Sequence, residues 1–195
     1  MNDIVRALAP VVDALDALGR TYRVGGSVAS SALGVPRSTL DVDIVCELHD
    51  EDVASFVGAL RAAYYVDEDM IRDAIRRRAS FNVVHLDTMM KVDVFVARGG
   101  AYDRVALSRV VRKALDESAR AYDLATAEDI VLRKLEWYRL GNEISERQWR
   151  DVIGVLQIQR GSLDRVYLEH WARELGLEAL LERAMREAQG PGETA

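Results

Sequence analysis

The stretch from residue 40 to residue 48, LDVDIVCEL, constrains the fold more than any other part of the chain. Apolar residues alternate there with Asp41 and Asp43, which is the pattern of a strand with one buried face. Residues two apart on a strand point to the same side, so the two carboxylates lie close together and repel each other. A divalent cation relieves this repulsion, and Mg²⁺ prefers such oxygen ligands. Two exposed acids at a strand edge are the alternative interpretation.

The residues before this strand indicate an anion site. Gly25, Gly26 and Ser27 follow a predicted short strand, TYRV, and lead into a short predicted helix that ends at Gly34. Glycine allows a close approach of backbone to ligand, and the free N–H groups at a helix N-terminus attract phosphate. No Lys-Ser or Lys-Thr follows the glycines, so the turn is not a Walker loop. Either the turn merely caps a helix, or it binds one end of a metal-bound polyphosphate.

A third acid lies farther along the chain. Asp93 stands between Val92 and Val94 in a segment that we predict to be the second strand of a hairpin, with its turn near Asp87 and Thr88. Three carboxylates on two adjacent strands can hold two metal ions that clamp the attacking and leaving oxygens. In such a site Asp93 would lie near the attacking hydroxyl and help to deprotonate it. A solvent-facing strand residue is the alternative.

The composition narrows the choice of partners and compartment. The chain has 195 residues, a formal net charge of −6 and one cysteine. An overall basic field for nucleic acid is therefore absent, and any contact with RNA or DNA would be local. No internal disulfide or zinc spacing is available. No run of 18 apolar residues occurs, so we expect no membrane segment and a cytoplasmic location.

The predicted secondary structure changes near residue 124. Helix and strand patterns mix before that point, with helices predicted at residues 3–19, 50–63 and 69–78 and a short strand or helix at 104–114. The rest reads as helices, and the first of them has Thr126 as its N-cap and Asp129 three residues later. We therefore predict an α+β core over residues 1–123, a helical domain over 124–190 and a disordered tail over 191–195.

These motifs together resemble the nucleotidyltransferase superfamily, which has the polymerase-β-like fold. The resemblance covers about residues 22 to 96 and rests on G-G-S at 25–27, on Gly34, Arg37 and Thr39, on D-x-D-I at 41–44 and on K-x-D at 91–93. It implies a mixed sheet with flanking helices and a C-terminal helical bundle. The implied activity is metal-dependent transfer of a nucleoside monophosphate from an NTP to an acceptor hydroxyl, with Mg²⁺ or Mn²⁺. The implied metal ligands are Asp41, Asp43 and Asp93, and the implied nucleotide site includes Gly25, Gly26, Ser27, Arg37 and Lys91.

The C-terminal helices are similar to those of the AbiEii-type toxin nucleotidyltransferases and their uncharacterised bacterial relatives. The first part also resembles CCA-adding enzymes, but Ala29 and Ser30 stand where those enzymes have Arg-Asp. The toxin resemblance implies that Lys134 is catalytic and that Arg150 and Asp151 complete the nucleotide site. Lys134 has no acidic neighbour three or four residues away, so it meets either a triphosphate or solvent. Asp151 could hold Lys134 in place, or it could merely cap the neighbouring helix turn.

The acceptor is open at this stage. The toxin resemblance implies the 3′ end of tRNA as acceptor and a cognate antitoxin as partner. A small molecule of the aminoglycoside kind is the alternative acceptor, and an acidic cleft would suit it. A non-catalytic nucleotide-binding module is the alternative to an enzyme, although intact Asp41, Asp43 and Asp93 count against it.

Overall fold

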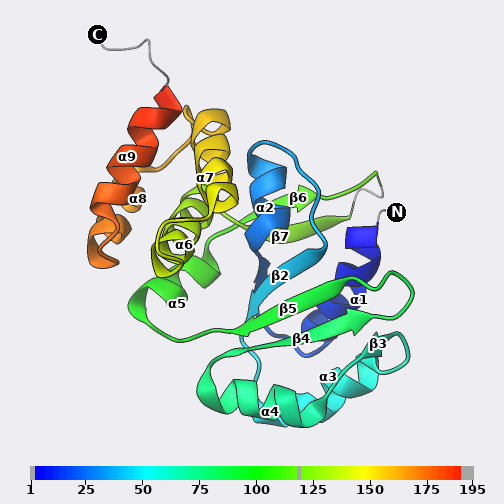
Figure 1. Ribbon diagram of the computed structural model, residues 1–195. Helices are drawn as coiled ribbons and strands as arrows, with labels where there is room; N and C mark the ends of the chain where they lie inside the picture. The colour runs from blue at the N-terminus through cyan, green and yellow to red at the C-terminus, as the bar shows by residue number, and fades with distance from the viewer. Residues whose placement is uncertain (1–2, 118–119, 190–195) are drawn as a thin grey trace. The chain divides into compact units, whose positions relative to one another are not determined.

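The computed structural model describes residues 3–117 and 120–189 (Figure 1). Within these ranges, one mixed sheet has the strand order β3-β4-β5-β2-β1-β7-β6. β2 runs parallel to β5 and β1 parallel to β7, while the other neighbouring strands are antiparallel. The predicted α+β class and the predicted β4–β5 hairpin are confirmed. The strands are β1 (Tyr22–Val24), β2 (Asp41–Cys46), β3 (Tyr64–Tyr65), β4 (Ser80–His85), β5 (Lys91–Val96), β6 (Val110–Ala114) and β7 (Ala121–Ala125).

One face of the central strands carries the apolar core. Helix α1 (Asp3–Ala17) packs against β2, β5 and α3 (Val53–Leu60), and α4 (Glu68–Arg77) packs against α3 and β4 (Figure 1). Buried and half-buried side chains alternate along β2 and β5, and the fully buried ones on β2 are Val42, Ile44 and Cys46. Because alternate residues point to opposite faces, the acids of these strands lie on the face away from this core.

Two short helices connect the strands of the sheet. Helix α2 (Gly26–Leu33) follows β1, and α5 (Ala101–Ser108) follows β5. Arg23 on β1 is only 2% exposed, and its Nη1 donates to the backbone carbonyl of Ala106 at 2.7 Å. This buried hydrogen bond fastens the end of α5 to the sheet.

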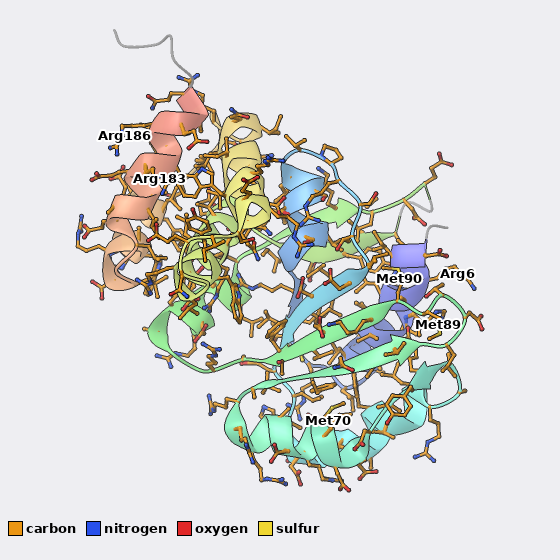
Figure 2. The ribbon with its side chains drawn as sticks, in the orientation of Figure 1. Arg6, Met70, Met89, Met90, Arg183 and Arg186 are labelled. Carbon is orange, nitrogen blue, oxygen red and sulfur yellow. The ribbon has the colours of Figure 1, made fainter. Side chains whose placement is uncertain are left out.

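The C-terminal part is helical, as predicted. It contains α6 (Ala127–Leu140), α7 (Glu146–Ile158), α8 (Arg165–Glu174) and α9 (Glu178–Gln189). The predicted cap is confirmed, since the Thr126 hydroxyl accepts a hydrogen bond from the backbone N–H of Asp129. Trp149 joins α7 to α9, because its indole donates to Glu187 at 2.9 Å. The guanidinium of Arg183, which is labelled on α9 in Figure 2, lies 4.3 Å from the centre of the Trp149 ring.

The chain divides into two compact units, each discontinuous in sequence. The sheet unit comprises the residues up to 28 together with 38–125, and the helical unit comprises residues 29–37 together with those from 126 onward. The border therefore falls within α2. Segment 29–37 groups with the C-terminal helices, although the sequence pattern places it in the core. The predicted boundary after residue 123 stays a prediction, and the predicted tail at 191–195 lies outside the described residues.

Several local features differ from the sequence-based expectations. A proline inside a helix kinks the helix or delays its start, but α1 begins at Asp3 and continues through Pro10. The helix expected from residue 50 begins as a 3-10 turn, Asp50–Asp52. Segment 104–114 is both helix and strand, and β7 was not predicted. In the described ranges, none of the helices has the length and apolar character needed to cross a membrane.

Candidate active site

The three predicted acids share one face of the sheet. The parallel register of β2 and β5 sets Asp43 opposite Asp93, and Asp41 opposite Lys91. Register partners on neighbouring strands lie about 4.8 Å apart and point to the same side. All four side chains are half-buried, on the face opposite the core. We call Asp41, Asp43, Asp93 and Lys91 the carboxylate face.

Asp41 and Asp93 each have a hydrogen-bond donor close by. The hydroxyl of Thr39 donates to Asp41 Oδ1 at 2.6 Å, which fixes the orientation of that carboxylate. Lys91 Nζ lies 2.8 Å from Asp93 Oδ2. The hydrogen bond to Asp93 raises the pKa of Lys91, burial opposes this rise, and the charges of Asp93, Asp41 and Asp43 add to it. Lys91 is therefore a charged ammonium among three carboxylates.

Gly26 brings backbone close to Asp43. Its φ is +52°, a left-handed conformation that favours glycine, and a Cβ at this position would overlap the Asp43 carboxylate and come within 2.9 Å of its Cβ. Gly25 donates its backbone N–H to the carbonyl of Asp43 at 2.8 Å, but a Cβ there would meet nothing within 4 Å. Gly26 is therefore the glycine that this turn requires. α2 begins at Gly26, so Gly26 and Ser27 belong to its first turn.

The chemistry of this face fits a magnesium ion. Mg²⁺ takes one or two carboxylates and completes its shell with water or phosphate oxygens, and Asp43 and Asp93 stand in register to supply them. However, in the part of the chain that the structure describes, no three His, Cys, Asp or Glu residues form a group that could hold a metal ion. Lys91 occupies Asp93 Oδ2, so a metal ion at Asp93 would bind the other oxygen close to the ammonium or displace the ammonium.

A second cluster of predicted residues lies in the helical unit. Lys134 on α6 is 5% exposed, and its Nζ lies 2.7 Å from Asp151 Oδ2 and 3.0 Å from Gln148 Oε1 on α7. Arg37 Nε and Nη2 each lie 2.8 Å from one oxygen of the Asp151 carboxylate. We call Arg37, Lys134 and Asp151 the Arg–Lys–Asp cluster. Because Lys134 is buried, the alternative of a solvated lysine is wrong.

The cluster carries an excess of positive charge. Burial raises the pKa of Asp151, but the hydrogen bonds from Arg37 and Lys134 outweigh burial and hold this pKa below its ordinary value. Two cations thus share one ionised carboxylate, and the cluster has one net positive charge. Arg150 does not join it: its side chain is 79% exposed and bonds Glu146 at 2.9 Å.

Asn82 lies beside the carboxylate face and was not predicted from the sequence. The antiparallel register of β4 and β5 sets Asn82 opposite Asp93, on the side away from Asp43. Its side chain is half-buried, and we find no hydrogen-bond partner for its amide within the described ranges. The predicted hairpin could have revealed this pairing of Asn82 with Asp93, because residues at equal distances from a turn centred between Asp87 and Thr88 pair with each other.

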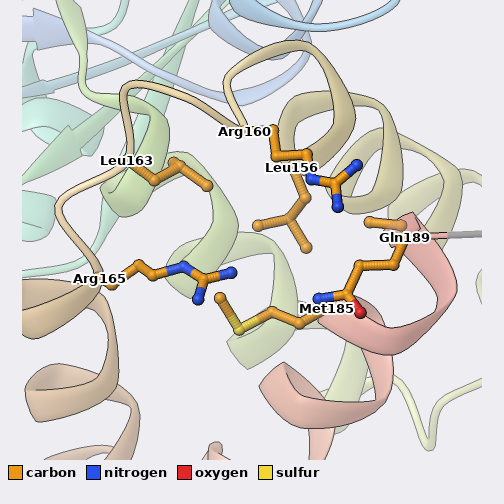
Figure 3. A pocket seen from close by; sticks show the side chains of 7 residues that line it. Leu156, Arg160, Leu163, Arg165, Met185 and Gln189 are labelled. Carbon is orange, nitrogen blue, oxygen red and sulfur yellow. The ribbon is translucent and has the colours of Figure 1, made fainter. Parts of the chain in front are cut away.

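A small pocket in the helical unit holds none of the predicted site residues. Arg160 and Arg165 line it together with apolar side chains that include Leu156, Leu163 and Met185 (Figure 3). The lining contains no acid, histidine or hydroxyl group that could serve as a base or nucleophile. We therefore place no chemistry there.

The comparisons with known proteins identify the fold. No protein-family model matches the chain, and no curated protein does so significantly. A nucleotidyltransferase-like antigen of Paracoccidioides brasiliensis is 18% identical with a TM-score of 0.52, and the alignment covers 91% of this chain and 90% of that one. ANT(2'')-Ia in complex with adenylyl-2''-tobramycin is 13% identical with a TM-score of 0.57, and the alignment covers 90% of this chain and 98% of that one.

A third solved structure comes from another class of antibiotic-modifying protein. The lincosamide adenylyltransferase LnuA, bound to lincomycin, is 12% identical with a TM-score of 0.51, and the alignment covers 78% of this chain and 96% of that one. At such low identities the likeness concerns the fold, and the chain has the nucleotidyltransferase fold that the sequence motifs predicted.

Proposed function

We propose that the protein is a metal-dependent nucleotidyltransferase that moves a nucleoside monophosphate from an NTP to an acceptor hydroxyl. The observation that carries this proposal is the carboxylate face: Asp41, Asp43 and Asp93 lie on one side of β2 and β5, with the backbone of Gly26 against Asp43. The face sits within the nucleotidyltransferase fold, and a hard-oxygen donor set beside a helix N-terminus suits a metal-bound triphosphate.

In the proposed reaction the acceptor oxygen attacks the α-phosphorus of the NTP. A new O–P bond forms, the bond between the α-phosphorus and the α,β-bridging oxygen breaks, and pyrophosphate leaves with that oxygen. The proton of the acceptor hydroxyl passes to the Asp93 carboxylate, after Lys91 has moved away from it. Bound Mg²⁺ or Mn²⁺ would supply charge neutralisation on the phosphates. Asp41 and Asp43 would hold the metal and Asp93 would complete the site, and Thr39 orients Asp41 for that task.

The other residues would bind and neutralise phosphate. The N–H groups of Gly26 and Ser27 open α2, where the helix dipole favours an anion, and Gly25 precedes them in the same turn. Arg37 and Lys134 supply the excess positive charge of their cluster, with Asp151 as the group that holds both. Arg150 would contribute only after leaving Glu146.

A small molecule with free hydroxyl groups is the first candidate acceptor. Two of the solved structures with this fold hold antibiotics, an adenylylated tobramycin and a lincomycin. The amide of Asn82 can donate to and accept from an acceptor hydroxyl group next to Asp93. The aminoglycoside class is therefore tested beside the lincosamide class.

The 3′ end of tRNA is the second candidate acceptor. It rests on the resemblance of the C-terminal helices to the AbiEii-type toxins, in which case the protein would have a cognate antitoxin as partner. The net charge of −6 limits such an RNA contact to a small region of the protein surface.

One assay tests both acceptors. The full chain is incubated with α-labelled ATP, CTP, GTP or UTP, with Mg²⁺ or Mn²⁺, and with an aminoglycoside and lincosamide panel or total tRNA. Label on one acceptor, lost in Asp41→Asn/Asp43→Asn, is the expected result. Asp87→Asn is the matched control, since Asp87 lies at the exposed β4–β5 turn with 75% of its side chain accessible.

The assay also separates the enzyme from a binding protein. Metal-dependent NTP binding without labelled product on any acceptor would support the non-catalytic nucleotide-binding module. Absence of both labelled product and NTP binding would refute the proposed function.

A further inference from the structure

Lys91 occupies the place where the proposed site needs a cation. Its Nζ lies 2.8 Å from Asp93 Oδ2, and the strand register sets Lys91 directly beside Asp41. The ammonium is thus a positive charge at the edge of three carboxylates. A metal ion at Asp93 would meet this charge at close range, and the repulsion between the two cations would weaken the binding of the metal.

The two partners of this ion pair differ in mobility. The side chain of Asp93 is short and 20% exposed, so it stays on the face of β5. The side chain of Lys91 is 45% exposed and has four rotatable carbon–carbon bonds, so its ammonium can swing to another anion. A triphosphate bound along Asp41 and Asp43 would offer such an anion, because its oxygens carry several negative charges.

We propose that Lys91 makes metal binding depend on the nucleotide. In the free protein the ammonium takes the place of the cation at Asp93, and it moves to a phosphate oxygen when the metal-bound triphosphate arrives. This inference rests on the proposed function. It follows that metal and nucleotide bind with positive cooperativity, and that each raises the affinity for the other by the same factor.

The size of the effect follows from Coulomb's law. A single and a double positive charge about 5 Å apart in water repel each other enough to weaken binding roughly tenfold. We therefore expect Lys91→Met to bind Mn²⁺ about tenfold more tightly than the unmodified chain when nucleotide is absent. In the presence of nucleotide the variant should lose most of the cooperativity, because its metal site is already accessible and its phosphate contact is gone.

The experiment measures Mn²⁺ affinity directly and needs no turnover. Free Mn²⁺ is followed by electron paramagnetic resonance during titration of the full chain, alone and with each α,β-methylene NTP in turn. Lys113→Met is the matched control, because it removes the same charge from β6, four positions from β5 in the sheet. Lys91→Arg keeps the charge and should keep the weak binding of Mn²⁺ alone, which separates charge from packing.

The outcomes distinguish the inference from the function on which it rests. One outcome is that the unmodified chain binds Mn²⁺ together with a nucleotide analogue, but Lys91→Met without nucleotide binds Mn²⁺ no more tightly than the unmodified chain does. The role of Lys91 is then refuted and the proposed function stands. If no chain binds Mn²⁺ with or without analogue, or Asp41→Asn/Asp43→Asn binds as well as the unmodified chain, both are refuted.

Discussion

Replacing Asp151 by asparagine should destabilise the helical unit strongly. The side chains of Asp151 and Lys134 are each only 6% exposed, so the change leaves the Lys134 ammonium buried and without this carboxylate, while Gln148 Oε1 still accepts a hydrogen bond from it. Removing one partner of a buried ion pair costs about 3–5 kcal/mol. Arg37 is 24% exposed, so water solvates its charge in part, and we expect the change to cost about 3 kcal/mol, the lower end of this range.

Tryptophan fluorescence is a suitable assay, because the chain's three tryptophans, Trp137, Trp149 and Trp171, all lie in the helical unit. Urea unfolding followed at these residues gives the free energy of unfolding of that unit. Glu146→Gln is the matched control: its carboxylate is 81% exposed, so the same chemical change should cost less than about 0.5 kcal/mol.

The pH dependence gives an independent check. The pKa of Asp151 is lowered in the folded protein, so its charge stabilises the fold above the unfolded pKa of about 3.9. This contribution is lost as pH falls through the lower, folded pKa. The stability difference between the unmodified chain and Asp151→Asn should therefore be constant above about pH 5 and narrow as the pH falls below it. A cost below about 1 kcal/mol at pH 7, or a difference that does not narrow in acid, would refute the reasoning.

Three further changes test the carboxylate face. Gly26→Ala places a Cβ against Asp43 and should abolish cooperative binding of Mn²⁺ and nucleotide, with about 1–2 kcal/mol of backbone strain. Gly25→Ala is the control and should leave the free energy of unfolding within about 0.5 kcal/mol of the unmodified chain. Equal effects of the two variants would contradict the conclusion that Gly26 is the glycine that the turn requires. Thr39→Val removes the donor to Asp41 and should weaken Mn²⁺ binding about tenfold in the titration, a loss that Thr39→Ser should restore. Asn82→Ala should raise KM for the acceptor about tenfold and leave KM for the NTP unchanged; a change in the NTP value alone would show that Asn82 faces the nucleotide.

The sequence predicted those parts of the fold that depend on local pattern. The alternation in residues 40–48 gave β2 with its acids on one face, and Thr126 gave the start of α6. β7 was missed because two of the five residues of Ala121–Ala125 are alanine, and because its inner partner β1 lies about a hundred residues away, although its other partner, β6, is close in sequence. Strand pairing over such separations leaves no trace in a local window.

The candidate site was predictable in part for the same reason. The identity of the three acids followed from spacing, whereas Asp151 entered as a possible partner of Lys134 only through the toxin resemblance. Gln148, which lies on the next helix, and the bond from Arg37, far upstream, to Asp151 were not foreseen. The bond between Lys91 and Asp93 was within reach of local reasoning, because residues two apart on a strand share a face.

The helical unit is built from two separate stretches of the chain, and this affects how it can be studied as a fragment. Residues 29–37 pack within it: Gln159 donates to the carbonyl of Leu33 at 2.7 Å, and a Cβ on Gly154 would meet Val35 at 3.1 Å. A fragment that starts at residue 126 would lack this segment, including Arg37, and would expose apolar side chains of α7 to water. The C-terminal helices therefore cannot be cut out or exchanged between proteins as one continuous cassette, and a circular permutant or a grafted 29–37 loop would be needed to study them alone.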